Sequence, residues 1–131
     1  MAELVVALDY HESGPALQLA RSLDGVDWFK VGSALFTAEG PPVVKALRDM
    51  GKKVFLDLKF HDIPNTVKAA VISAAGCGAN MANIHLSGGA DMIDAAVEGR
   101  EEAAARGHKA VILGVTVLTS VGAKNLHQAG F

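Results

Sequence analysis

The chain has 131 residues, of which 50% are hydrophobic and 20% are charged, a composition that predicts one folded domain and excludes an intrinsically disordered chain. The chain contains 12 Lys and Arg residues and 14 Asp and Glu residues. The resulting net charge of −2 indicates no basic surface for nucleic acid or an anionic membrane. The single cysteine, Cys77, excludes an intrachain disulfide and fits a cytoplasmic protein. No segment is typical of a signal peptide or a membrane-spanning helix.

Five short apolar runs predict five β-strands. They cover residues 4–8, 28–31, 54–58, 81–86 and 110–118. Because these runs are continuous rather than strictly alternating, they are typical of parallel strands that are buried on both faces.

Between the strands, apolar residues recur with helical spacing and predict four helices, near residues 16–23, 43–50, 67–74 and 92–106. Glycines that suit left-handed caps follow the last three of them, at Gly51, at Gly76 or Gly78, and at Gly107. Strand and helix therefore alternate, which predicts an α/β fold built from βα units. No linker or change in composition divides the chain, so we expect a single domain over residues 1–131.

Two α/β architectures fit this alternation. One is an open, doubly wound parallel sheet, and the other is the first five strands and four helices of a (β/α)8 TIM barrel, a fold of about 250 residues. The periodicity also predicts no helix between the fifth strand and Phe131. The pattern of apolar residues leaves both architectures open.

Polar side chains gather where the predicted strands end. Asp9 follows the first strand, Lys30 lies in the second, Asp57 and Lys59 end the third, and His85 ends the fourth. Thr116, Thr119 and Ser120 follow along the fifth. Since the active site of a parallel barrel lies at the carboxyl ends of its strands, this concentration on one rim indicates a functional site rather than isolated structural ion pairs.

The third strand carries the most specific pair. Residues two apart in a strand share a face, so Asp57 and Lys59 point into the same space, which Lys30 reaches from the neighbouring strand and Asp62 from the following turn. Alternating charges would keep Lys59 protonated, as a proton donor for a developing carbanion. The alternative is a buried ion-pair network without chemistry.

A metal site is not predicted. The nearest cluster of possible ligands is Asp57, His61 and Asp62, and the Lys59 ammonium between them would compete with a cation. No glycine-rich nucleotide-binding loop occurs either, so the simplest expectation is a reaction that uses no cofactor.

At residues 57–66 the sequence Asp-Leu-Lys-Phe-His-Asp-Ile-Pro-Asn-Thr resembles the signature of the orotidine 5'-phosphate decarboxylase family. Further blocks that resemble the family, in the same order, lie at residues 5–9, 30–32, 83–89 and 115–120. The resemblance covers essentially the whole chain and is strongest to the bacterial branch. It implies the N-terminal part of a TIM barrel that converts orotidine 5'-monophosphate to UMP without a cofactor, in pyrimidine biosynthesis.

The resemblance also implies roles for the residues of the array. Lys59 matches the lysine that protonates C6 of the pyrimidine as carbon dioxide leaves. Asp57 matches an aspartate that lies against the substrate carboxylate. Lys30 matches a residue that bridges the array and contacts the ribose, and Asp9 matches one that binds a ribose hydroxyl.

Other substrate contacts implied by the resemblance lie outside the strands. Asp62 and Thr66 match residues that reach the ribose from the partner subunit, which implies a homodimer with shared active sites. Ser120 matches a residue that reads the pyrimidine ring. Ile63, in the same motif as Asp62, and His85 are also expected to bind substrate. The alternative for His85, a single histidine on a strand, is a hydrogen-bonded core residue.

Two alternatives accompany the resemblance. The family's phosphate-binding residues lie in its second half, beyond these 131 residues, so the chain alone is either an incomplete enzyme or an inactive half-barrel. Magnesium-dependent sugar-phosphate lyases and decarboxylases share the Asp-x-Lys-x-x-Asp core and use a carboxylate near the end of the second strand. Here no acidic residue follows Lys30 before Glu39, which argues against them.

Overall fold

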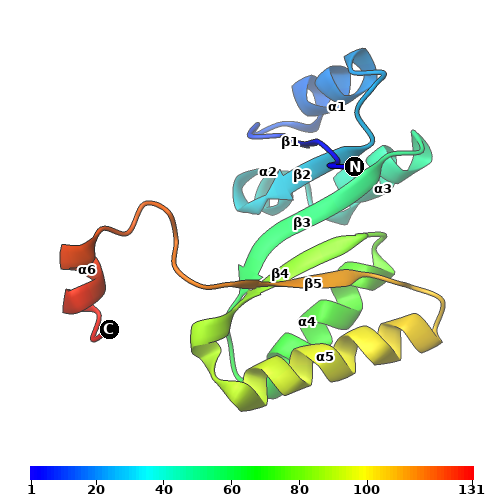
Figure 1. Ribbon diagram of the computed structural model, residues 1–131. Helices are drawn as coiled ribbons and strands as arrows, with labels where there is room; N and C mark the ends of the chain where they lie inside the picture. The colour runs from blue at the N-terminus through cyan, green and yellow to red at the C-terminus, as the bar shows by residue number, and fades with distance from the viewer.

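A computed structural model describes all 131 residues as a five-stranded parallel sheet with helices packed on it (Figure 1). The strands are β1 (Val5–Ala7), β2 (Trp28–Gly32), β3 (Lys53–Phe60), β4 (Met81–His85) and β5 (Val111–Val115). The helices are α1 (Ser13–Ser22), α2 (Ser33–Glu39), α3 (Pro41–Asp49), α4 (Pro64–Gly76), the 3-10 turn η1 (Leu86–Gly88), α5 (Ala90–Ala105) and α6 (Ala123–Gln128).

The order of the strands decides between the two predicted architectures. The strands lie side by side in chain order, β1-β2-β3-β4-β5, and each pairs in parallel with the next. A doubly wound sheet reverses its strand order at a switch point, whereas a barrel does not. The α/β fold is therefore confirmed as the barrel type, and the doubly wound alternative is wrong.

The helices other than α6 cover one face of the sheet (Figure 1). Phe29, Val31, Val54 and Leu56 point to this face, are at most 1% exposed, and form the centre of the main core. On the other face Asp57 and Asn83 are buried, but apolar residues of β5 are not, and Val111 is 53% exposed. The expectation of strands buried on both faces is therefore wrong for β5, whose second face is exposed at Val111.

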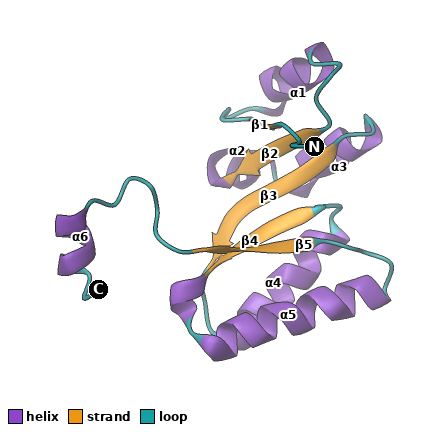
Figure 2. Ribbon diagram, in the orientation of Figure 1, coloured by secondary structure: helices purple, strands orange, loops and turns teal.

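The helices α4 and α5 lie together against β4 and β5 (Figure 2), and a second, smaller core lies where they meet the sheet. Its members are Val67, Val71, Ile84, Met92 and Ala96. The two helices approach closely at Gly99, where an added Cβ would lie 2.7 Å from the carbonyl oxygen of Lys68.

Two helices were not predicted from the sequence. The helix α2 contains only seven residues, of which Leu35 alone is buried, so it shows almost no apolar periodicity. The helix α6 has no buried residue and stands apart from the sheet (Figure 1). The prediction that no helix follows the fifth strand is therefore wrong.

Two of the predicted glycine caps are present, and one predicted strand boundary differs. Gly51 and Gly107 follow α3 and α5 with φ of 77° and 90°, which confirms left-handed caps there. The fifth strand is shorter than predicted, because Val117 and Leu118 lie beyond it and are exposed. No helix has the length and apolar character needed to cross a bilayer.

Candidate active site

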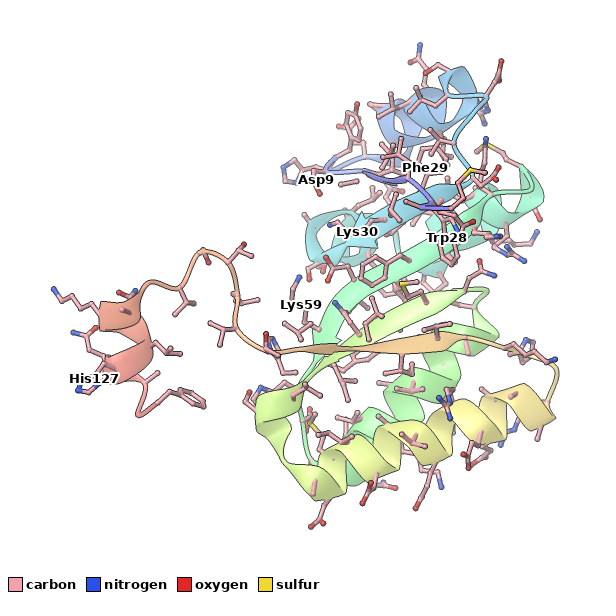
Figure 3. The ribbon with its side chains drawn as sticks, viewed as in Figure 1. Asp9, Trp28, Phe29, Lys30, Lys59 and His127 are labelled. Atoms are coloured by element: carbon pink, nitrogen blue, oxygen red, sulfur yellow. The ribbon has the colours of Figure 1, made fainter.

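Three charged residues follow one another along the carboxyl ends of neighbouring strands. Figure 3 shows Asp9 after β1, Lys30 on β2 and Lys59 on β3 at the same edge of the sheet. Asp57 joins them: its Oδ2 lies 3.2 Å from Lys30 Nζ, and its Oδ1 lies 2.7 Å from Lys59 Nζ. Lys30 Nζ also lies 3.7 Å from Asp9 Oδ1. The parallel register of β1, β2 and β3 thus assembles an alternating array of charges.

Asp57 is the buried centre of this array, with 11% of its side chain exposed. Burial alone would raise the pKa of its carboxyl group, but hydrogen bonds from Lys59, Asn83 and Lys30 together outweigh burial, and the pKa is lowered from the ordinary value of 3.8. The carboxylate is therefore charged at neutral pH and holds two ammonium groups beside it.

The strand β3 is irregular where it carries the array. Leu56 pairs with Ala82 and Phe60 pairs with Ile84, so three residues of β3 lie opposite Asn83 alone. Within this bulge Lys59 has φ of 49°, and no other residue except glycine has a positive φ. That conformation costs a non-glycine residue about 1–2 kcal/mol. Bulges beside active sites re-aim side chains, and this one carries the ammonium of Lys59.

Asn83 of β4 belongs to the site, although sequence reasoning gave it no role. It is 3% exposed, its Nδ2 donates to Asp57 Oδ1 at 2.8 Å, and its Oδ1 accepts from the backbone N–H of Lys59 at 2.8 Å. The available signal was a polar residue inside an apolar strand, next to the strand that carries Asp57, because a buried amide needs hydrogen-bond partners.

Two hollows meet at Lys59. The first, of about 340 Å³, is lined by the whole array of Asp9, Lys30, Asp57 and Lys59. The second, of about 400 Å³, is lined by Lys59 together with residues at or beyond the ends of β3 and β4, among them His61, Asp62, Thr66 and His85. The imidazole rings of His61 and His85 lie 5.4 Å apart.

Asp62 is placed differently from the sequence prediction. Its Oδ1 accepts a hydrogen bond from the N–H of Ile63 at 2.7 Å, and it forms no ion pair with Lys59 of the same chain. The prediction that Asp62 completes the array within one chain is therefore wrong, and Asp9 is the second carboxylate instead. Ile63 is 66% exposed, Ser120 is also exposed, and neither lines the two hollows.

The first hollow combines two ammonium groups with two carboxylates. Such a site can hold a polar ligand and deliver a proton to it, because Asp57 fixes the position of the Lys59 ammonium. Glu39, the first acidic residue after Lys30, instead accepts a hydrogen bond from the N–H of Ser13 at 3.1 Å. No three His, Cys, Asp or Glu side chains group as metal ligands do.

Comparison with known proteins identifies one family that this chain resembles. The model of the orotidine 5'-phosphate decarboxylase / HUMPS family matches residues 2–130. An orotidine 5'-phosphate decarboxylase of Nitratidesulfovibrio vulgaris strain Miyazaki F is 60% identical over 92% of this chain and 54% of its own length. One from Carboxydothermus hydrogenoformans is 48% identical over 98% of this chain and 54% of its own length. The chain spans about half the length of the curated relatives it matches.

Solved structures share the fold. Orotidine 5'-phosphate decarboxylase from Lactobacillus acidophilus superposes with a TM-score of 0.86 at 36% identity, over 98% of this chain and 59% of that one. An uncharacterised conserved protein from Geobacillus kaustophilus superposes with a TM-score of 0.88 at 40% identity, over 95% of this chain and 59% of that one. The five strands therefore match about half of a TIM barrel, and the chain belongs to the orotidine 5'-phosphate decarboxylase / HUMPS family.

Proposed function

We propose that this chain supplies the catalytic residues of an orotidine 5'-monophosphate decarboxylase, which forms UMP and carbon dioxide without a cofactor. The observation that carries the proposal is the array of Lys30, Asp57 and Lys59, held by contacts of 3.2 and 2.7 Å beside a hollow at the strand ends. Family membership and the relatives' names support the same reaction.

Lys59 is the proposed proton donor. When the bond between C6 and the carboxylate breaks, its electron pair stays on C6, and carbon dioxide leaves. The Lys59 ammonium gives its proton to C6, becomes a neutral amine, and is reprotonated from solvent. A preorganised cation beside the developing carbanion stabilises the transition state more than the ground state.

Asp57 has two proposed roles. It holds the Lys59 ammonium at 2.7 Å, and its lowered pKa keeps it charged. A charged Asp57 also repels the substrate carboxylate, and this repulsion disappears as neutral carbon dioxide forms, which favours the reaction. Lys30 and Asp9 would then bind the ribose, since they extend the array along β2 and β1.

A homodimer with shared active sites is also proposed, in the cytoplasm. Its support is the position of Asp62, just before α4, and Thr66, in its first turn, which are exposed and line the second hollow instead of the first. From there they would reach the ribose in the partner's site. His85 of the same hollow, exposed Ile63 and Ser120 are the remaining proposed substrate contacts.

The proposed activity requires the rest of the barrel, because the resemblance places the phosphate-binding residues outside these 131 residues. The test is reconstitution: this chain is mixed with the C-terminal part of the Nitratidesulfovibrio relative that lies beyond the matched region. We expect the assembled mixture to form UMP, and each part alone to form none. A mixture that assembles by mass and binds UMP but does not decarboxylate the substrate would overturn the proposal.

A further inference from the structure

We infer that Asn83 is a positioning residue for the proton donor: one amide group orients the Asp57 carboxylate and fixes the backbone of Lys59. The catalytic consequence of this inference rests on the proposed function, whereas the positioning itself does not.

The geometry shows how one side chain serves two residues. Asn83 Nδ2 donates to Asp57 Oδ1 at 2.8 Å, and Asn83 Oδ1 accepts from Lys59 N at 2.8 Å. Asp57 Oδ1 therefore accepts hydrogen bonds from both Asn83 Nδ2 and Lys59 Nζ, while Asp57 Oδ2 lies beside Lys30 Nζ. With 3% of Asn83 exposed, water has little access to replace either bond.

The bulge explains why the backbone of Lys59 needs such a partner. Lys59 keeps φ of 49° in the stretch where β3 and β4 lose their regular register. A non-glycine residue holds this conformation only where its surroundings fix it. If the bond from Lys59 N to Asn83 is lost, the backbone can relax toward the extended region, and this rotation turns the ammonium away from Asp57.

Asn80 provides a matched control. It precedes β4, and its Oδ1 accepts hydrogen bonds from Val54 N at 2.9 Å and from Arg48 Nη1 at 3.0 Å. Like Asn83, it therefore ties β4 to the backbone of β3, but at the opposite end of the strands and away from the charged array. A merely structural asparagine at position 83 would behave as Asn80 does.

The first test uses NMR on the 131-residue chain with Asn83→Leu and Asn80→Leu. We expect Asn83→Leu to raise the pKa of the Asp57 carboxyl group, followed by its carbon shift, because a hydrogen bond to the charged form is lost. We also expect hydrogen exchange at the Lys59 amide to become about tenfold faster. Asn80→Leu should change neither quantity. Equal effects of the two variants would overturn the inference.

A second variant keeps the test decisive if Asn83→Leu does not fold. Asn83→Asp retains an oxygen acceptor for Lys59 N but replaces the donor to Asp57 with a like charge. We expect the Lys59 amide to stay protected while the pKa of Asp57, which also faces Lys30 and Lys59, rises. A pKa of Asp57 that stays at the parent value would contradict the inference.

The last measurement concerns catalysis in the reconstituted protein. We expect Asn83→Leu to lower kcat about a hundredfold with KM nearly unchanged, because a misplaced donor affects the transition state more than binding. Asn80→Leu should retain kcat. Unchanged kcat in Asn83→Leu would overturn the catalytic part. If the parent mixture itself forms no UMP, the proposed function fails, and the NMR result still decides whether Asn83 positions the array.

Discussion

The ammonium of Lys59 lies 2.7 Å from Oδ1 of Asp57, two residues earlier in the same strand, although the backbone between them is irregular. Both partners come from β3, and the amide that joins them comes from the neighbouring β4. The relative position of the donor and the carboxylate therefore depends on two adjacent strands and not on closure of a barrel.

Lys59→Ala should abolish decarboxylation in the reconstituted protein and leave UMP binding largely intact, since the lost proton donor acts mainly in the transition state. Turnover and UMP affinity are measured on the same preparation. The matched control is Lys53→Ala, at the exposed beginning of β3, where the lysine pairs with Glu3. Turnover of Lys59→Ala within about tenfold of the parent would exclude Lys59 as the donor.

Asp62 tests the shared active site. Lys59→Ala is introduced in one preparation of the reconstituted dimer and Asp62→Ala in another, and each should be strongly impaired. After mixing and subunit exchange, half of the dimers are mixed, and each has one site with both defects and one intact site. Activity should return to about a quarter of the parent's, because half of the dimers then have one of their two sites intact. This estimate takes the doubly defective site as inactive, since defects within one site are not additive.

The control for this experiment is exchange itself, which is followed by mass with one isotopically labelled preparation. If exchange is complete and no activity returns, Asp62 acts in the site of its own chain. The dimer would then have two independent sites.

The lowered pKa of Asp57 predicts that the stability of the fold depends on pH. Its pKa is lowered in the folded state, so its contribution to stability is complete above the unfolded pKa of about 3.8 and is lost as pH falls through the folded pKa. Asp57→Asn should lower the free energy of unfolding by about 3 kcal/mol at neutral pH, because two ammonium groups lose their buried partner. The difference in the free energy of unfolding between Asp57→Asn and the parent should become smaller below about pH 4.

Urea denaturation across this pH range measures the effect. The matched control is Asp49→Asn, whose exposed pair with Lys45 within α3 should contribute less than about 1 kcal/mol at any pH. If the difference in the free energy of unfolding between Asp57→Asn and the parent is constant with pH, the fold does not stabilise the charged form of Asp57.

Gly99 tests the contact between α4 and α5. An added Cβ would lie 2.7 Å from the Lys68 carbonyl oxygen, so Gly99→Ala should push the helices apart and lower the free energy of unfolding by about 2 kcal/mol. Gly76→Ala, at the end of α4 with open space around it, should be neutral or stabilise by about 0.5 kcal/mol. Equal urea midpoints for the two variants would contradict the close approach.

Most of the fold was accessible from the sequence because buried strands and amphipathic helices leave periodic apolar residues. The order of the strands could not be predicted, because the apolar pattern shows which residues are buried but not which strands are neighbours in the sheet. The helix α6 was missed for a related reason: none of its residues is buried, so packing imposed no pattern on it.

The residues of the candidate site were also only partly predictable from the sequence. Asp9, Lys30, Asp57 and Lys59 were found because each is a charge at the end of an apolar strand, and the parallel register brings such ends together. Asn83 was missed because the only local signal is its polar side chain inside an apolar strand, whereas its importance arises from the bulge of β3 opposite it.

The consecutive strand order has a consequence for how the site forms during synthesis on the ribosome. Each strand pairs with the one made just before it, so the sheet can grow in the order of translation. Asp9, Lys30, Asp57 and Lys59 all precede β4, and Asn83 arrives with it. Once β4 has left the ribosome and joined the sheet, the part of the chain that ends at His85 contains every partner that holds Lys59 in place.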